Sequence, residues 1–119
     1  MGKSIVLVED DPAILDVMQI ILGRAGYIVS TYHNGATLKD HSNLPDLYII
    51  DKQLSGIDGL EICKQLKNNN DTAHLPVIIL SASPRIENMV KLAGADAFIE
   101  KPFAKKLLIE TIEALLKEK

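Results

Sequence analysis

The sequence lacks the features of secreted, membrane-spanning and nucleic-acid-binding chains. Its 119 residues include one cysteine, so no internal disulfide can form and a reducing cytosol suits the chain. No apolar run approaches the ~18 residues of a membrane-spanning helix, and no leader-like segment precedes the first apolar run. The net charge is only -3, without a long block of either sign. We therefore expect a cytoplasmic protein that grips neither nucleic acid nor a membrane surface.

What is present is ordinary globular material, with 47% hydrophobic and 24% charged residues. Its length predicts a single domain, residues 1–119. Neither a glycine-rich phosphate loop nor an internal repeat occurs. Cys63 shares a helical face with Leu60 and Leu66, so we expect it to be a small core residue.

Most of the chain alternates between short continuous apolar runs and helical patterns. Such runs are typical of strands buried on both faces of a sheet. The expected strands are 4–8, 27–32, 47–50, 76–80 and 95–99, and the expected helices are about 12–25, 35–41, 57–66, 85–92 and 105–116. The apolar positions of the first helix are Ile14, Val17, Met18, Ile21 and Leu22. Five strands alternating with five helices predict an α/β fold, a doubly wound parallel sheet with helices on both faces.

Polar residues follow the ends of several expected strands. They are Glu9, Asp10, Asp51, Ser81 and Lys101. Each has an ordinary alternative, because the acids could cap helices, the serine could be a loop hydroxyl and the lysine could be exposed. In an open parallel sheet, however, the carboxyl ends of the strands meet at one edge, where ligands bind. Their shared position favours one functional site.

Four motifs at these positions resemble the receiver domain of two-component response regulators. They are VEDDP at 8–12, IID at 49–51 with DG at 58–59, VIILSA at 77–82 and GADAFIEKPF at 94–103. Their order and spacing carry the resemblance, which covers residues 5–116. It implies the CheY-like, flavodoxin-like (βα)5 fold with strand order 2-1-3-4-5. That order would bring Glu9 and Asp10 beside Asp51.

Carboxylates packed this closely need a cation, because they cannot all stay ionised cheaply without one. A hard divalent ion bound through oxygen suits them, with Mg²⁺ expected and Mn²⁺ as the alternative. The resemblance implies Glu9 and Asp10 as the acidic pair. It implies Asp10, Asp51 and the backbone carbonyl of Gln53 as the direct ligands. Asp11 is expected to be the N-cap of the helix that starts at Pro12.

The resemblance further implies that Asp51 accepts a phosphoryl group from a sensor histidine kinase or a phosphotransfer protein. Lys101 would be the ion-pair partner of that group, and the Ser81 hydroxyl would turn toward it. Phe98 is either the aromatic that reports the switch or a plain core residue. The signal would pass to a downstream protein, with homodimer formation on phosphorylation left open. The Lys101–Pro102 bond would be cis.

Several positions depart from the family pattern. Ser55 stands where proline is common, and Lys52 and Gln53 replace residues that are more often apolar. Gln53 and Ser83 are expected to tune the lifetime of the phosphorylated state. The interval from 81 to 101 is about two residues shorter than is usual in the family, so we expect either a clipped helix or a tightened loop within it.

Two other functions stay open. An aspartate-nucleophile phosphatase would want a second acid two residues after the nucleophile, where the chain has Gln53. A receiver-like module could instead bind partners without being phosphorylated. We expect no enzyme beyond self-phosphorylation and autodephosphorylation. No DNA-binding segment is expected after the last helix, and the chain is either a stand-alone regulator or a receiver from a larger protein such as a hybrid kinase.

Overall fold

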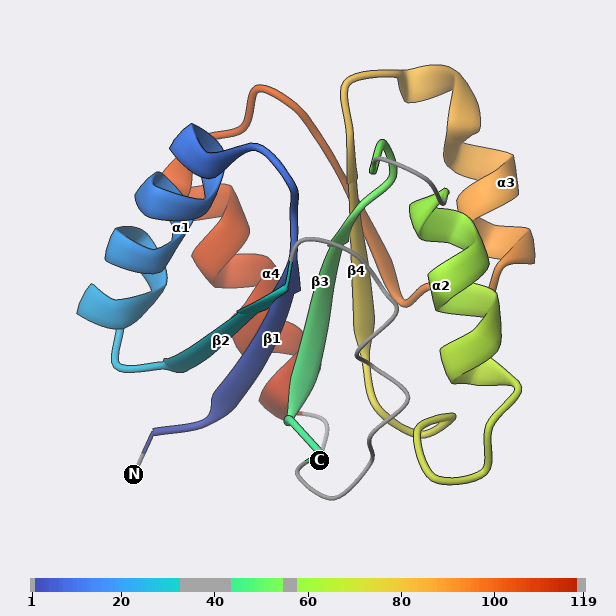
Figure 1. The fold of residues 1–119 in the computed structure, drawn as a ribbon, viewed down its shortest axis with the longest axis horizontal. Helices are drawn as coiled ribbons and strands as arrows, with labels where there is room; N and C mark the ends of the chain where they lie inside the picture. The colour runs from blue at the N-terminus through green and yellow to red at the C-terminus, as the bar shows by residue number, and fades with distance from the viewer. Residues whose placement is uncertain (1, 33–43, 55–57, 118–119) are drawn as a thin grey trace.

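The computed structural model describes residues 2–32, 44–54 and 58–117. Within them, five parallel strands form one sheet in the order β2-β1-β3-β4-β5 (Figure 1). The strands are β1 (Ser4–Val8), β2 (Ile28–Tyr32), β3 (Leu47–Asp51), β4 (Val77–Ser81) and β5 (Ala97–Glu100). The helices are α1 (Pro12–Arg24), α2 (Gly59–Lys67), α3 (Glu87–Leu92) and α4 (Lys105–Lys117), with a 3₁₀ turn, η2 (Pro84–Ile86), before α3. The predicted α/β fold and strand order are confirmed, and the helix expected at 35–41 lies outside the described residues.

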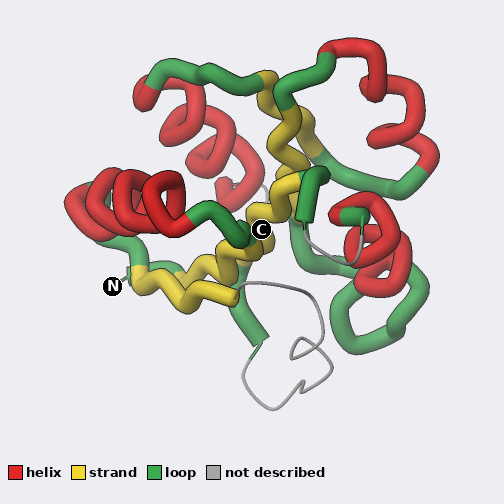
Figure 2. The backbone as a smooth tube through the Cα atoms, turned by 45° about the horizontal axis from the view of Figure 1, so that its top comes forward, coloured by secondary structure: helices red, strands yellow, loops and turns green. Residues whose placement is uncertain are grey.

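Helices cover both faces of the sheet, α1 and α4 on one and α2 and α3 on the other (Figures 1 and 2). Strands β3 and β4 are buried along their whole length, which explains why their sequences are continuous apolar runs. Alternate residues of the strands point to opposite faces of the sheet, so each face has its own hydrophobic core. The α2 side contains Val8, Ile50, Leu60, Ile79 and Val90, among others, and the α1 side contains Leu7, Met18, Ile49, Leu80 and Leu108.

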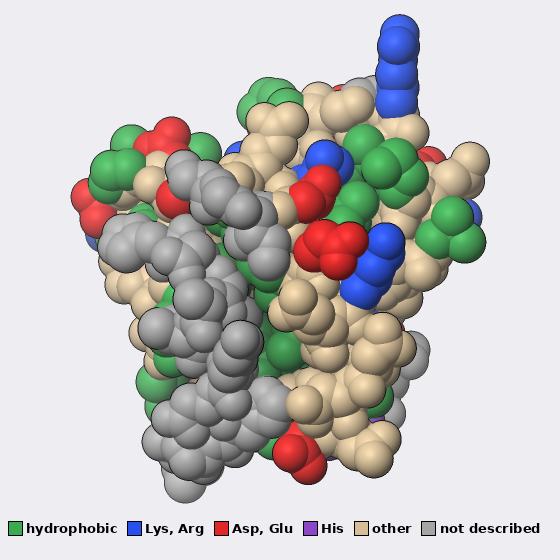
Figure 3. Space-filling model, turned by 45° about the vertical axis from the view of Figure 1, so that its right-hand side comes forward, with side chains coloured by type: hydrophobic (Ala, Val, Ile, Leu, Met, Phe, Trp, Pro, Cys, Tyr) green, Lys and Arg blue, Asp and Glu red, His purple; other side chains and the backbone are tan. Residues whose placement is uncertain are grey.

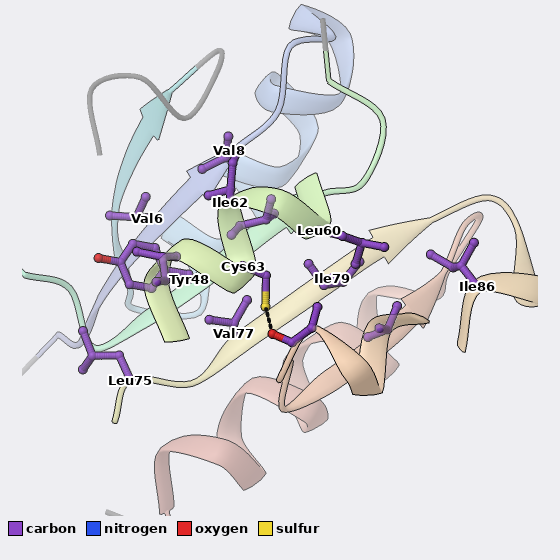
Figure 4. Packing of buried hydrophobic residues seen from close by; sticks show 14 residues of the cluster. Val6, Val8, Tyr48, Leu60, Ile62, Cys63, Leu75, Val77, Ile79 and Ile86 are labelled. Carbon is purple, nitrogen blue, oxygen red and sulfur yellow. Dashed lines mark hydrogen bonds between the residues drawn. The ribbon is translucent and has the colours of Figure 1, made fainter. Parts of the chain in front are cut away.

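Cys63 lies in the core on the α2 side, as the sequence predicts. It is fully buried, and its thiol donates a hydrogen bond to the backbone carbonyl of Ala93 at 3.5 Å (Figure 4). Burial raises the pKa of the thiol to about 11, so it stays protonated and unreactive at neutral pH.

The polar strand ends are held by the sheet itself. Asp51 and Ser81 are the last residues of β3 and β4, one residue beyond the expected ends. The ladder continues past them, because the Lys52 N–H donates to the Leu80 carbonyl at 2.8 Å and the Lys101 N–H donates to the Ser81 carbonyl at 2.8 Å. Hydrogen bonds of the sheet, rather than loop packing, therefore set how these positions are spaced.

The apolar pattern of α1 is wider than the stripe that the sheet buries. The buried side chains are Leu15, Met18 and Leu22, whereas Val17, expected on the apolar face, is 55% exposed. Ile20 is also exposed, at 54%. Apolar residues surround more of the helix than one contact face can cover, so periodicity alone did not identify the buried stripe. The remainder forms an exposed apolar strip on α1.

The surface mixes charges of both signs. On the face seen in Figure 3, acidic and basic side chains lie next to one another among polar and apolar ones. Exposed pairs such as Lys64 with Glu61, 3.7 Å apart, follow the same arrangement. No helix within the described ranges has the length and apolar character needed to cross a bilayer.

Candidate functional site

A cavity of about 180 Å³ opens at the carboxyl edge of the sheet. It is lined by Glu9, Asp10, Asp11, Ile14, Asp51, Gln53, Ala82 and Lys101. These residues come from four separate parts of the chain, which the order β1-β3-β4-β5 brings together. The expected metal ligands, the expected phosphoacceptor Asp51 and Lys101 thus line one cavity, whereas Ser81 does not.

Asp51 is the central residue of the cavity and is only 3% exposed. Its Oδ2 lies 2.9 Å from the Nζ of Lys101, which donates a hydrogen bond to it. Its Oδ1 accepts a hydrogen bond from the backbone N–H of Gln53 at 3.2 Å. Both carboxylate oxygens are thereby oriented, and the lysine supplies the positive charge that a buried acid needs.

Glu9 is more deeply buried, at 1% exposure, and is less well satisfied. Its Oε2 accepts the backbone N–H of Asp11 at 3.2 Å, but its buried Oε1 has no hydrogen-bond partner. Lys101 Nζ is 3.7 Å from that oxygen, beyond good hydrogen-bond distance. Burial, followed by the neighbouring Asp51 carboxylate, raises the pKa of Glu9 from 4.5 to about 7. For Glu9, the raising effects of burial and of Asp51 outweigh the lowering effect of Lys101.

A Glu9→Gln variant is expected to be more stable than the wild type in EDTA at pH 8. Because the folded-state pKa is raised, the stability that the protonated group contributes is complete below pH 4.5 and is lost as the pH rises through about 7. Glutamine cannot ionise, so the gain should be on the order of 1–3 kcal/mol in the free energy of unfolding. Urea titrations at several pH values test this, with Glu61→Gln on the exposed face of α2 as the matched control. Parallel pH profiles for Glu9→Gln and wild type would contradict it.

The donor set fits a hard divalent cation. Among the described residues, no three acidic, histidine or cysteine side chains converge closely enough to hold an ion by themselves. Mg²⁺ does not require this, since it is usually bound by one or two carboxylates and completes its octahedron with water and carbonyl oxygens. Asp10, Asp51 and Gln53 line the cavity beside the Glu9 oxygen that has no hydrogen-bond partner. Oxygen donors of this kind are the ligands that Mg²⁺ and Mn²⁺ prefer.

Ser81 is not among the residues that line the cavity, whereas Asp11 is. Ser81 is buried, and its Oγ accepts a hydrogen bond from the backbone N–H of Ser83 at 3.1 Å. Asp11 caps α1, as expected, since its Oδ1 accepts the Ala13 N–H at 2.9 Å. The Lys101–Pro102 bond is cis, as the resemblance implied.

Phe98 lies on β5 and is half-buried against the core on the α2 side. It borders a pocket of about 150 Å³, whose wall includes Glu87, Val90 and Lys91 of α3. This position is compatible with both readings of the side chain, since it touches the core and also reaches a hollow at the surface. The α3 helix beside it has only six residues, which agrees with the expected clipping.

Sequence reasoning missed two features next to Asp51. Lys52 forms an ion pair with Asp58 at 3.0 Å, and Gly59 packs directly against the backbone of Asp51 and Lys52. In the sequence, the Asp58–Gly59 dipeptide is part of a motif of the resemblance, which does not show these contacts. Nothing in the sequence pattern shows that a glycine Cα is pressed against a neighbouring strand.

The model of the response regulator receiver domain family matches residues 5–113. The chain belongs to this family. This receiver domain is 35% identical over 121 residues to the response regulator MprA of Mycobacterium bovis, covering 98% of the chain and 52% of MprA. The receiver domain thus spans about half the length of the curated relatives it matches. Receiver domains act in two-component signalling and are not enzymes in the usual sense.

Solved structures of receiver domains and response regulators have the same fold as this chain. The receiver domain of a signal transduction histidine kinase from Syntrophus aciditrophicus superposes with a TM-score of 0.90 at 32% identity, covering 98% of this chain and 92% of that one. The response regulator TrrA from Thermotoga maritima, in complex with Mg²⁺-BeF, gives a TM-score of 0.86 at 30% identity, covering 95% and 98%. Receiver domains of this kind bind Mg²⁺ in the active site and take part in signalling with sensor histidine kinases.

Proposed function

We propose that Asp51 of this receiver domain accepts a phosphoryl group in a Mg²⁺-dependent reaction. The observation that carries the proposal is the position of its carboxylate, buried at the cavity and held by Lys101 at 2.9 Å. A carboxylate oriented in this way can attack phosphorus, and enzymes use aspartate as such a nucleophile. The Mg²⁺-BeF complex of TrrA supports the same reading by homology.

The other residues then have defined roles. Asp10, Asp51 and the Gln53 carbonyl would hold the cation, and Glu9 would add negative charge beside them. Mg²⁺, when bound, supplies positive charge for the phosphoryl oxygens. Lys101, now paired with Asp51, would contact one of the phosphoryl oxygens. Ala82 is small and would leave the mouth of the cavity open.

Ser81 and Phe98 would report the change. The Ser81 hydroxyl now accepts a hydrogen bond within its own turn, from Ser83. Turning toward a phosphoryl group on Asp51 would release that turn, which begins the η2–α3 segment next to Phe98. Phosphorylation would in this way alter what the α3 side of the domain binds, a downstream protein or a second copy.

Intact mass measurement after incubation with acetyl phosphate tests the proposal. One phosphoryl adduct should form with Mg²⁺, and none should form in EDTA. A labile adduct is expected, because an acyl phosphate hydrolyses readily. Failure of a folded protein to form the adduct with Mg²⁺, together with partner binding that ignores phosphodonors, would instead indicate a phosphorylation-independent binding module.

The partner that supplies the phosphoryl group is proposed to be a sensor histidine kinase or a phosphotransfer protein, in the cytoplasm. An open apolar groove of about 530 Å³ runs beside the cavity, between α1 and the connection from β5 to α4. It shares Ile14, Ala82 and Lys101 with the cavity wall. A protein donor seated there would bring its phosphohistidine to Asp51. We further propose that residues 1–119 act as one receiver unit.

Val17→Asp is expected to slow phosphoryl transfer from such a kinase roughly tenfold, because it places a charge in the apolar groove. Val17 is 55% exposed, so the fold should tolerate the change. Labelling by acetyl phosphate, which needs no docking, should be unaffected. The matched control is Ile20→Asp, one turn along α1, 54% exposed and outside the groove lining. Equal slowing by both variants would place the docking face elsewhere.

A further inference from the structure

The side chain of Lys52, which follows Asp51 in the chain, crosses the β3–α2 connection to Asp58. Its Nζ lies 3.0 Å from Asp58 Oδ2, and its side chain is only 17% exposed. Two backbone ties join the same segments, an antiparallel bridge between Gln53 and Asp58 and a hydrogen bond from the Gly59 N–H to the Lys52 carbonyl at 2.8 Å. The ion pair adds a side-chain tie between these two segments.

Asp58 uses both carboxylate oxygens. Oδ1 accepts the Leu60 N–H at 2.8 Å and so caps α2, and Oδ2 receives Lys52. The ion pair therefore connects the first residues after Asp51 to the rigid start of a helix. On the other side of Lys52, the Gln53 N–H donates to Asp51 Oδ1 at 3.2 Å, and Gln53 lines the cavity.

We infer that Lys52 is a positioning residue for the cation and phosphoacceptor site. Its ion pair with Asp58 fixes the backbone of residues 52–53, so that the Gln53 N–H and carbonyl stay aligned with Asp51. The inference rests on the proposed Mg²⁺ site. Replacing a residue that contacts and orients a metal ligand commonly lowers the affinity for the metal.

Charge and positioning predict opposite effects at Lys52. Removing a positive charge close to a cation site would, by Coulomb attraction alone, tighten Mg²⁺ binding. Loss of the clasp to Asp58 would instead loosen the Gln53 backbone and weaken binding. The sign of the change in Mg²⁺ affinity therefore separates the two roles.

The experiment is isothermal titration of Mg²⁺ into the unphosphorylated protein at fixed pH. Lys52→Met keeps the apolar stem but not the ion pair, and is expected to weaken Mg²⁺ binding roughly tenfold. Lys52→Arg should restore most of the affinity. Asp58→Asn retains the helix cap, and combining it with Lys52→Met should weaken binding no further than Lys52→Met alone, because the two residues act as a pair. The matched control is Lys64→Met, which removes the exposed ion pair between Lys64 and Glu61 on α2. It should bind Mg²⁺ as tightly as the wild type does.

Unchanged or tighter Mg²⁺ binding by a folded Lys52→Met would overturn the inference while leaving the proposed function in place. No binding by the wild type would overturn the Mg²⁺ site itself, and the inference with it. Equal losses in Lys52→Met and Lys64→Met would show a general effect of lysine removal and would also contradict positioning. Circular dichroism and urea midpoints identify any variant that has lost its fold.

Discussion

Asp51→Asn is expected to abolish the phosphoryl adduct completely while the domain stays folded. Asparagine has the same shape, and its Oδ1 can still accept the Gln53 N–H that now bonds to Asp51 at 3.2 Å. The amide cannot act as the nucleophile, so no acyl phosphate can form. Lys101 would lose its partner at 2.9 Å and keep the Glu9 carboxylate, 3.7 Å away, as its counter-charge. The measurement is intact mass after acetyl phosphate with Mg²⁺, combined with circular dichroism.

The matched control for this variant is Asp16→Asn, which removes a carboxylate from the exposed side of α1. It should be labelled like the wild type. Residual labelling of Asp51→Asn, on Asp10 or any other acid, would refute the assignment of Asp51. Loss of labelling in both variants would indicate that net charge, rather than a specific nucleophile, governs the reaction.

Gly59→Ala is expected to destabilise the domain by about 1–3 kcal/mol and to weaken Mg²⁺ binding. A Cβ at this position would overlap the carbonyl oxygen of Asp51 and come within 2.8 Å of the Cα of Lys52. Both obstacles are backbone atoms, so they cannot swing away as a flexible side chain could. The start of α2 would have to move off β3, and the strain would be carried to Asp51. Urea unfolding and titration with Mg²⁺ would measure both consequences.

The control for this steric argument is Gly23→Ala in α1, where an added Cβ meets nothing within 4 Å. Alanine is the better helix former, so Gly23→Ala should stabilise the protein by roughly 0.5–1 kcal/mol. Opposite signs for the two glycine-to-alanine changes are the expected result. A gain at Gly59 would show that α2 does not press on β3 as closely as the structure indicates.

The sequence predicted the α/β fold class and most of the polar residues that line the cavity. Runs such as 77–80 are apolar at every position, so they indicate strands between two helix layers, and a parallel sheet brings strand ends such as Asp51 to one edge. The resemblance to receiver domains added the strand order, which places Glu9 beside Asp51. These predictions depended on the order and spacing of residues along the chain, which can be read without knowing side-chain contacts.

What the sequence could not provide depended on directions and contacts between side chains. Val17 was expected on the apolar face of α1, but which stripe of a broadly apolar helix faces the sheet is decided by packing. The pairing of Lys52 with Asp58 and the tight approach of Gly59 also arise only in three dimensions. The unpartnered oxygen of Glu9 belongs to the same class, since no one-dimensional pattern shows which buried acid is left without a donor.

The backbone hydrogen bonds just beyond β3 and β4 make the geometry at Asp51 independent of the length of the η2–α3 segment. The Lys52 N–H is hydrogen-bonded to the Leu80 carbonyl, and the Lys101 N–H to the Ser81 carbonyl. The spacing of Asp51, Ser81 and Lys101 is therefore set by hydrogen bonds between adjacent strands. The η2–α3 segment between Ser81 and Lys101 can therefore shorten or lengthen without changing distances at Asp51. Changes in this segment would then alter the surface proposed to bind a partner without moving the groups proposed to take part in phosphoryl transfer.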